Sequence, residues 1–469
     1  MKELPIHIQL HPEDNKTLYI QIYEYIRDEI RAGNLLQNEK LPSARFLAED
    51  LQVSRTTVDM AYDQLVSEGY LEARPRRGYF VSAYEELNVI DEIPYREMRK
   101  PQDKKEEESI RYDFSPNAID MRYFPYATWK KITKNILVDA NSKMFSLGEP
   151  QGDLNLRTTI CRYLHGSRGV NCEPEQIIIG AGNDYLLLLL EKILGRHVHV
   201  AMENPTYIRA YRIFRSCAYP VSLIPMDENG IMVECLRRTD ARVAYVMPSH
   251  QYPTGISMPI GRRLELLKWA AEEKDRYLIE DDYDSEFRYR GKPLPSLQAS
   301  DHNGKVVYIG TFSKSIAPAI RISYMVLPYP LLEKYRKECG FYSSTVSRLD
   351  QTILNEFIQD GYFERYLNKM RKQYREKHDL ILNELKPFEK AFRISGSNAG
   401  QHVLLTDVKG RKEEELANMA KEAKVKVYRM QDFRIEKNSD DPAMLLLGYG
   451  ALSFEEIKEG IALLKKILV

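Results

Sequence analysis

The chain has 469 residues, of which 43% are hydrophobic and 29% charged, and its 68 basic residues balance its 68 acidic ones. These proportions are typical of a globular protein with several domains, and they exclude collagen-like, low-complexity and disordered classes. Because the net charge is zero, the whole chain has no general attraction to polyanions, and any nucleic-acid binding must be local. The five cysteines are scattered without metal-type spacing, so we expect no metal site. Because the sequence has no long apolar run and no apolar leader, we expect a soluble, cytoplasmic protein.

The chain divides into segments of different character. Residues 1–82 and 112–469 show regular hydrophobic patterns, whereas residues 83–111 are polar and rich in both charges, which is linker composition. Within the second patterned segment, we expect residues 112–330 to form a large domain. Residues 331–469 should form a long helix and a small α+β subdomain.

The amino-terminal segment predicts three helices followed by a β-ribbon. Apolar residues recur every fourth position over 18–30, a short helix is expected over 43–51, and a third helix begins at Ser54. Two short strands are expected within 70–81, around a basic turn. Two helices joined by a tight turn and followed by a ribbon form a winged helix-turn-helix, whose second helix enters the major groove of DNA.

The candidate DNA contacts lie at the start of the third helix and on the helix before it: Ser54, Arg55, Thr56, Thr57 and Arg45. Arg55 can donate two hydrogen bonds to guanine, whereas the hydroxyls and Arg45 can bind phosphates. The segment as a whole has ten basic and thirteen acidic side chains, so charge alone favours a helical hairpin with solvated arginines. Five of the ten basic residues lie at expected contact points of one face, and this segregation favours DNA binding.

The strings LPSARFLAE (41–49), VSRTTV (53–58) and SEGYL (67–71) closely resemble the GntR family of bacterial transcription regulators. The resemblance covers the whole amino-terminal module. It implies that DNA is contacted by Arg45, Arg55, Thr56 and Thr57, with Arg76, Arg77 and Gly78 in the wing.

The second segment alternates β-rich runs with helical stretches. Strands are expected at 176–179, 197–202, 219–224, 242–246, 277–280, 306–309 and 322–327. Helices are expected over 184–194 and 262–274. This alternation favours a mostly parallel sheet with helices on both faces. Further along the chain we expect a long helix over 350–385, strands at 400–407, 425–429 and 444–447, and a last helix from Phe454.

A lysine and a carboxylate directly follow two of the expected strands. Lys314, in the string TFSKS, could be an ordinary surface lysine near a turn. Ligands of open α/β sheets, however, bind at the carboxyl ends of strands, and a lysine whose pKa is lowered there can form a Schiff base with an aldehyde. Asp281 ends another strand and can keep a pyridine nitrogen protonated, with the phenol of Tyr283 on the same side of the extended chain.

Two further features suit a phosphorylated aromatic ligand. Gly182 and Asn183 join a strand to the helix from Asp184, where backbone N–H groups and the helix dipole can hold a phosphate. Tyr207 offers a ring for stacking, although a lone tyrosine after a strand is more often part of a core. Together, a lysine, an acid, a phenol, a ring and a phosphate cradle suit pyridoxal 5'-phosphate (PLP).

These residues resemble the fold type I aminotransferases over residues 112–469. The resemblance implies that Lys314 carries PLP as a Schiff base, that Asp281 pairs with the pyridine nitrogen and that Tyr283 faces the 3'-oxygen. It also implies ring stacking by Tyr207 and phosphate binding by Gly182, Asn183, Ser313 and Arg321.

One string departs from the aminotransferase pattern. The aminotransferase string N-P-T-G reads Tyr252-Pro253-Thr254-Gly255 here, so the asparagine that contacts the cofactor oxygen is replaced. His250 or Gln251 is the candidate substitute, and this departure argues against productive transamination.

A GntR-type winged helix joined to an aminotransferase-like domain resembles the MocR subfamily of GntR-type transcription regulators, and most of all its PLP-sensing regulators of vitamin B6 synthesis. We therefore expect a multidomain fold: an amino-terminal winged helix-turn-helix and a carboxy-terminal fold type I α/β domain with a smaller α+β subdomain. The resemblance implies a PLP-binding regulator rather than an enzyme, with at most weak transaminase chemistry. Two alternatives remain open: a sensor of an amino acid or amine such as γ-aminobutyrate, and an active PLP-dependent aminotransferase.

The choice between PLP and an amine as effector depends on arginines. The resemblance implies that amine-sensing relatives hold the substrate carboxylate with two of them, and Arg209 matches the first. The best register places Asp432 at the second position, and a register shifted by two or three residues would place Arg429 or Arg434 there. An aspartate would repel a carboxylate, so we expect PLP itself to be the effector.

The expected partner is a double-stranded DNA operator with repeated half-sites, bound by a domain-swapped homodimer. The dimer and the swap are implied by the resemblance. A flexible linker over 83–111 has an r.m.s. reach of roughly 30 Å. This reach is near the ~34 Å between half-sites one helical turn apart.

Overall fold

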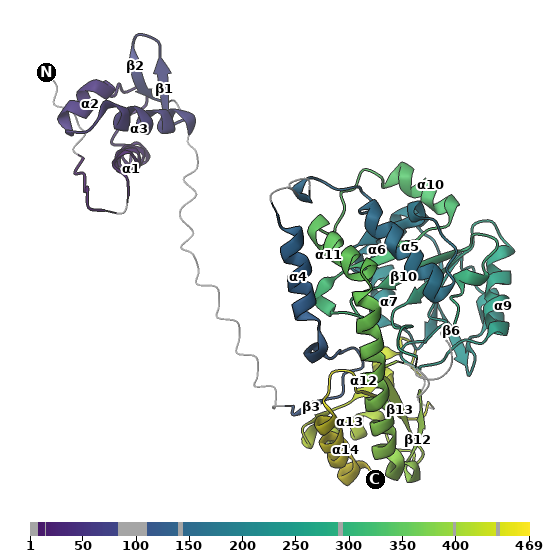
Figure 1. Ribbon diagram of the computed structural model, residues 1–469. Coiled ribbons are helices and arrows are strands. Elements are labelled where there is room, and N and C mark those ends of the chain that lie inside the picture. Colours follow the sequence, from purple (N-terminus) through teal and green to yellow (C-terminus); the bar gives the residue numbers. More distant parts are fainter. Residues whose placement is uncertain are drawn as a thin grey trace. The chain divides into compact units, whose positions relative to one another are not determined.

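The computed structural model describes residues 8–14, 16–82, 110–138, 144–288, 294–396, 400–437 and 441–469. They belong to two compact units, one within residues 1–105 and one within residues 106–469 (Figure 1). Of the predicted linker, residues 83–109 lie outside the described residues. Arg111 belongs to the second unit, because its backbone N–H donates to the Lys424 carbonyl.

The first unit has the predicted winged-helix elements: α1 (Leu18–Arg31), α2 (Ala44–Asp50), α3 (Arg55–Ser67), β1 (Leu71–Arg74) and β2 (Gly78–Val81). The two strands pair antiparallel. Ser43 and Ser54 cap α2 and α3, since their hydroxyls accept the N–H groups of Phe46 and Thr57. One buried cluster joins the apolar faces of all three helices, which leaves the start of α3 exposed.

An eight-stranded sheet organises the second unit: β4 (Ile177–Gly180), β5 (Val200–Asn204), β6 (Val221–Asp227), β7 (Gly230–Ile231), β8 (Val243–Val246), β9 (Tyr277–Asp282), β10 (Val306–Thr311) and β11 (Ser323–Val326). The strand order is β4-β11-β10-β9-β8-β5-β6-β7. The central run from β10 to β6 is parallel, as predicted, whereas β11 and β7 pair antiparallel with their neighbours. The strand expected from His197 begins three residues later, because His197 lies in a turn with φ 63°.

Helices cover both faces of this sheet: α4 (Tyr126–Ile136), α5 (Leu154–Arg168), α6 (Asn183–Leu194), α7 (Ile208–Ser216), α8 (Val233–Arg237), α9 (Ile260–Ala271), α10 (Tyr329–Glu338) and α11 (Arg348–Gln359). Alternate residues of one strand enter different clusters. On β9, for example, Ile279 packs in the cluster of α6, α7 and α10, whereas Leu278 packs in the cluster of α9. The predicted two-sided burial of the sheet is therefore confirmed.

The prediction of one continuous helix over 350–385 is wrong. The segment is divided into α11 and α12 (Tyr362–Leu385) by Gly361, whose φ of 72° is left-handed and ends the helical path. The amino-terminal part of α12 packs in the core of the large sheet, through Phe363 and Tyr374, and its carboxy-terminal part packs in a separate core through Ile381. Figure 1 shows α12 running from the large sheet to the smaller subdomain.

The smaller subdomain has an antiparallel sheet in the order β12-β13-β16-β15, with strands β12 (Phe392–Ser395), β13 (His402–Asp407), β15 (Tyr428–Arg429) and β16 (Met444–Gly448). Its helices are α13 (Glu413–Glu422) and α14 (Phe454–Leu468). The strand predicted over 425–429 is two strands, because β14 (Val425–Lys426) pairs instead with β3 (Tyr112–Asp113).

The boundary between the two cores does not lie at residue 330, where the sequence predicted the large domain to end. Residues up to Tyr374 pack with the large sheet, whereas Tyr112 and Phe114 pack in the smaller core. The chain thus enters the smaller subdomain first, crosses to the large sheet and returns along α12. None of the helices in the described part of the chain is long and apolar enough to cross a membrane.

Candidate ligand pocket and DNA-contact surface

A cavity of about 260 Å³ lies in the second unit, where β9 and β10 end and α6 begins. Eight of the predicted site residues line it: Asn183, Tyr207, Arg209, Asp281, Tyr283, Ser313, Lys314 and Arg321. They come from segments that are far apart in the chain, and the parallel strands bring them together at one edge of the sheet.

Lys314 follows β10 and presents its amine to this cavity. Its Nζ donates to the Pro116 carbonyl oxygen at 3.1 Å. Burial lowers the Lys314 pKa to about 8, although the nearby Asp284 carboxylate opposes the shift. A larger fraction of the amine is therefore neutral near neutral pH, which is the form that attacks a carbonyl group.

Asp281 lies at the end of β9 and is only 4% exposed. The hydroxyl of Tyr245 donates to one carboxylate oxygen, and the Asn183 side-chain amide donates to the other at 3.3 Å. Burial raises the Asp281 pKa to about 7 even though the Tyr245 hydrogen bond lowers it. A cationic ring nitrogen beside Asp281 would stabilise its ionised form.

The other end of the cavity is suited to an anion. Arg321 donates to the Ala181 carbonyl and lies 3.4 Å from the Asp184 carboxylate. A Cβ on Gly182 would collide with the Arg321 guanidinium, so the glycine allows this close approach. Among the described residues, the buried Ser313 hydroxyl has no hydrogen-bond partner, and the first turn of α6 directs its N–H groups toward this end. These groups fit a phosphate.

Three aromatic side chains form the wall of the cavity beside Lys314. Tyr207 contacts the Tyr252 ring edge to face, with centroids 6.2 Å apart. The Tyr283 hydroxyl lies 2.9 Å from Nδ1 of His250, and the Asp284 carboxylate lies 2.8 Å from the same nitrogen. His250, itself held by Asp284, therefore holds the Tyr283 hydroxyl in place.

His250 and Gln251, the predicted substitutes for the missing asparagine, do not line the cavity. His250 contacts the Tyr283 hydroxyl. Gln251 accepts from Thr254 in its own loop and donates to the Pro205 carbonyl, which lies between β5 and α7. The cavity is lined instead by Tyr252 and by Asn117, whose side-chain amide donates to the Tyr252 hydroxyl at 3.0 Å.

Arg209 lines the cavity with a side chain that is 60% exposed, and it lies 3.3 Å from Asp184. The residue expected at the second arginine position, Asp432, does not line the cavity; it is exposed and pairs with Arg429 at 2.7 Å. Arg434 pairs with Asp441 at 2.6 Å.

The smaller subdomain instead places an aromatic ring against this part of the wall. The Phe433 ring packs edge to face on Tyr252, with centroids 5.2 Å apart. In this stretch of the chain it is Phe433, next to Asp432, that contacts the residue Tyr252 of the cavity wall.

The predicted DNA contacts lie on the exposed side of the first unit. The side chains of Arg45 and Arg55 are 80% and 71% exposed, and each lies near a carboxylate one helical turn further on, Glu49 and Asp59. Thr56 is exposed, whereas the Thr57 hydroxyl is 2.8 Å from the Ser54 hydroxyl.

The wing presents a tight, exposed turn. Arg76 has φ 61° and Gly78 has φ 105°, and the Arg77 N–H donates to the Arg74 carbonyl. Arg76, Arg77 and Gly78 are all exposed. The turn therefore directs two arginines outward on a short ribbon.

Sequence reasoning missed several residues of the site, among them Asp184 and Asn117, which line the cavity, and Tyr245, which donates to Asp281 but does not line it. Tyr245 lies on an expected strand, so its position near the strand end was a usable signal. Asp184 was noted only as the start of a helix, and its carboxylate contacts both Arg209 and Arg321. No sequence motif marks Asn117, and only the path of the folded chain places it at the cavity.

Comparisons with known protein families match both units. Residues 18–81 match the family of bacterial regulatory proteins of the gntR type, and residues 117–447 match the class I and II aminotransferases. The HTH-type transcriptional regulator YdeL of Bacillus subtilis is 40% identical over 98% of this chain and 99% of its own.

Two further relatives carry more specific names. The probable rhizopine catabolism regulatory protein MocR of Rhizobium meliloti is 35% identical over 78% of this chain and 76% of its own. The pyridoxine biosynthesis transcriptional regulator PdxR of Corynebacterium glutamicum is 32% identical, covering 86% of each chain.

Among solved structures, LysN, an α-aminoadipate aminotransferase of Thermus thermophilus, is similar with a TM-score of 0.66 and 26% identity. The match covers 76% of this chain and 91% of that one. That structure holds N-(5'-phosphopyridoxyl)-L-leucine. The fold of the second unit is thus that of fold type I aminotransferases.

Proposed function

Because the chain belongs to the MocR subfamily of GntR-type transcription regulators, we propose that it binds PLP on Lys314 and that PLP itself changes its action on DNA. The genes under its control would be those of PLP synthesis. The observation that carries the proposal is the convergence of Lys314, Asp281 and Arg321 on one small cavity.

The residues around this cavity match the parts of PLP. Ser313, Asn183 and Arg321 would hold the phosphate, Asp281 the ring nitrogen, and Tyr283 the ring oxygen, with Tyr207 stacked on the ring. PLP supplies an aldehyde that condenses with a primary amine. The lowered pKa of Lys314 favours that condensation.

The charges of the pocket support PLP rather than an amino acid as the effector. Among the described residues, the cations that line the cavity are Lys314, Arg321 and Arg209. The first two are used by PLP, which leaves Arg209 as the cation for a carboxylate. Arg429 and Arg434, the candidates for a second one, are paired with carboxylates away from the cavity.

The effect on DNA requires that PLP bind two states of the protein with different affinity, because equal affinity shifts nothing. Under this proposal the protein is a homodimer, domain-swapped as in the family, and its two winged helices occupy repeated half-sites. Sedimentation at micromolar concentration tests the dimer, and a monomer would overturn that part of the proposal.

The central experiment compares operator affinity of the PLP-free and PLP-loaded protein by fluorescence anisotropy, while visible absorbance reports attachment to Lys314. Amino acids and amines are then titrated. We expect PLP alone to change operator affinity. If PLP attaches but leaves DNA binding unchanged, and one amino compound alters both absorbance and affinity, the protein is an amine sensor.

Arg209 is the specific observation that favours this amine-sensor alternative. The variant Arg209→Gln, with Arg212→Gln on the same exposed helix surface as matched control, separates the two functions. For a PLP sensor, neither variant removes the response of DNA binding to PLP. For an amine sensor, only Arg209→Gln removes the response to the amino compound.

An active aminotransferase is a third candidate, because the fold is shared with such enzymes. Tyr252 stands where those enzymes have asparagine, which argues against efficient turnover. A coupled assay with common amino donors and 2-oxo acids tests this candidate. Sustained multiple turnovers would establish an enzymatic function.

A further inference from the structure

The segment 112–120, here called the strap, leads from the linker into the second unit. Its first part belongs to the smaller subdomain: Tyr112 and Phe114 are buried in that core. The Phe114 N–H donates to the Lys426 carbonyl at 3.0 Å, and the Phe114 carbonyl accepts from the Gly448 N–H at 2.8 Å. The strap is thus attached to both β14 and β16.

Two glycines of the smaller subdomain allow the strap to lie against them without a gap. A Cβ on Gly448 would collide with the Ser115 carbonyl, and a Cβ on Gly450 would approach the Ala118 carbonyl to 2.5 Å. The Ser115 and Ala118 carbonyls therefore pack directly on the backbone at the end of β16 and just after it.

The opposite side of the strap faces the ligand pocket. The Pro116 carbonyl accepts from Lys314 Nζ at 3.1 Å, and the Asn117 amide donates to the Tyr252 hydroxyl at 3.0 Å. Lys314 and Tyr252 both belong to the part of the unit built on the large sheet. These two hydrogen bonds therefore connect the smaller subdomain, through the strap, to the residue proposed to hold PLP.

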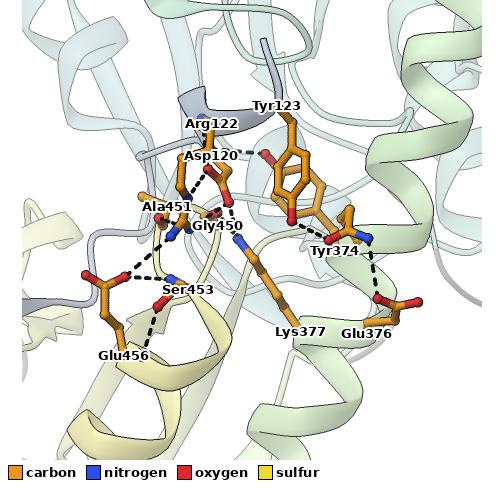
Figure 2. Close-up of polar contacts among 11 residues, drawn as sticks. Asp120, Arg122, Tyr123, Tyr374, Glu376, Lys377, Gly450, Ala451, Ser453 and Glu456 are labelled. Carbon is orange, nitrogen blue, oxygen red and sulfur yellow. Dashed lines mark hydrogen bonds and ion pairs between the residues drawn. The ribbon is translucent and has the colours of Figure 1, made fainter.

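The end of the strap is fixed by a buried ion pair. Figure 2 shows Asp120 between Lys377 and Arg122, with Lys377 Nζ 2.7 Å from the carboxylate and 2.9 Å from the Gly450 carbonyl. Arg122 makes two further hydrogen bonds of 2.8 Å to Asp120 and one of 3.0 Å to the Ala451 carbonyl.

The Asp120 and Lys377 side chains are each 1% exposed, so separating them would leave an unpaired buried charge. Beyond this point the chain enters the core of the large sheet. The ion pair therefore fixes the end of the strap, and the strap residues that contact the pocket are Pro116 and Asn117.

We propose that the position of the strap depends on whether the Lys314 amine is free or attached to a carbonyl compound. Pro116 and Asn117 are positioning residues that hold the free lysine amine and the smaller subdomain together, and attachment of a carbonyl compound to Lys314 releases the middle of the strap. This inference rests on the proposed function and extends it to how occupancy of the pocket reaches the chain segment that leads to the DNA-binding unit.

The hydrogen count at the lysine nitrogen gives the physical reason. A neutral amine has two hydrogens and can donate one to the Pro116 carbonyl. When it condenses with an aldehyde, a C=N bond forms, the C=O bond breaks, and the oxygen leaves as water with both amine hydrogens. The Pro116 carbonyl then loses its donor, because a neutral imine nitrogen has no hydrogen and the single hydrogen of a protonated imine is shared with the adjacent ring oxygen of PLP. A buried carbonyl without a partner is unfavourable, so the strap shifts. Asn117 alone then holds the strap to the pocket.

Hydrogen–deuterium exchange of the full-length protein tests this. We expect the peptide covering residues 111–122 to exchange at least about fivefold faster in the PLP-loaded protein than in the PLP-free protein, since one hydrogen bond of about 1 kcal/mol is lost. Lys314→Met should reproduce the faster exchange without PLP and show no further response to it. The control Lys134→Met removes an exposed lysine on α4 and should exchange like the unmodified protein.

A second pair of variants isolates the contribution of Asn117. Asn117→Ala should accelerate exchange of the same peptide about two- to fivefold in the PLP-free protein, whereas the exposed Asn135→Ala on α4 should not. In a Lys314→Met background, Asn117→Ala should cause a different change from the one it causes alone, because both residues hold the same segment. A merely structural role of Asn117 would give the same change in both backgrounds.

Equal exchange of the 111–122 peptide in PLP-free, PLP-loaded and Lys314→Met protein overturns the inference. Failure of the proposed function is a separate result, in which PLP produces neither visible absorbance nor a borohydride-fixed mass increase. In that case the Lys314→Met variant still tests whether the lysine amine holds the strap, because it removes the amine without any ligand.

Discussion

The DNA-contact surface and the ligand pocket are built in opposite ways. The first uses residues that are close in sequence, from Arg45 to Thr57 and from Arg76 to Gly78, and presents them on exposed helix and ribbon ends. The second collects side chains from Asn117 to Ser323 around a small cavity. A surface of the first kind can be recognised from a local motif, whereas a pocket of the second kind depends on the path of the whole chain.

The charges of the two regions also behave differently. Arg45 and Arg55 lie near carboxylates on their own helices, and exposed pairs of this kind contribute only about 0.3–0.5 kcal/mol, so DNA phosphates can displace them. In the pocket, burial lowers the pKa of Lys314 and raises that of Asp281, each toward neutrality. We therefore expect DNA binding to respond mainly to salt and ligand attachment mainly to pH.

The largest effect should come from Lys314→Ala, because it removes the amine that attaches PLP. Visible absorbance of the bound cofactor and the mass increase after borohydride reduction should both disappear. Operator binding should remain measurable, since Lys314 lies in a different unit from the DNA contacts. A borohydride-fixed adduct that persists in this variant would show that another lysine carries the cofactor.

The next largest effect concerns the pH dependence of PLP attachment. The neutral fraction of an amine rises with pH up to its pKa, so with a pKa of about 8 the rate should rise about tenfold per pH unit below pH 7 and level off above pH 8. At pH 7.5 this gives about 200 times more neutral amine than a lysine with the ordinary pKa would have. Stopped-flow absorbance measures the rate, and a rise that continues unchanged to pH 10 would contradict the lowered pKa.

The same contrast explains how much could be predicted from the sequence. The winged helix was predictable throughout, because capping serines, periodic apolar residues and a short basic turn are all local signals. Lys314 and Asp281 were predictable because one closely follows β10 and the other lies at the carboxyl end of β9. The break at Gly361 was missed even though a glycine inside a helical pattern is a local signal.

Other features were not accessible from local patterns. The contact between Asn117 and Tyr252 joins residues 135 positions apart in the sequence. The pairing of β3 with β14, which takes the start of the second unit into the smaller subdomain, joins residues still further apart in the sequence. Gln251 was misplaced because its side chain bonds to Thr254 of its own loop and to the Pro205 carbonyl, 46 positions away in the sequence.

A smaller effect should separate base recognition from phosphate binding within the DNA-contact surface. Arg55→Ala should weaken specific binding by about 1–3 kcal/mol and relax base preference, because the start of α3 contacts base edges. Arg77→Ala should weaken binding to all sequences alike and reduce the salt slope by about 1, because wing residues contact phosphates. Anisotropy titrations with operator and random DNA at several salt concentrations distinguish the two, and equal effects of both variants on both DNAs would refute this division of roles.

The smallest effect should come from Ser54, which caps α3 and lies beside the DNA contacts. Ser54→Ala removes the acceptor of the Thr57 N–H and should destabilise the winged helix by about 1 kcal/mol, measured as faster exchange of the first-turn amides of α3 in the full-length protein. Ser54→Asp keeps a capping acceptor, so the same amides should stay protected. Its negative charge should nevertheless repel DNA phosphates and weaken binding to every sequence, with the loss shrinking as salt rises. If Ser54→Asp bound DNA as well as the unmodified protein, the start of α3 would not face the phosphate backbone, and the DNA-contact surface would have to lie elsewhere on this unit.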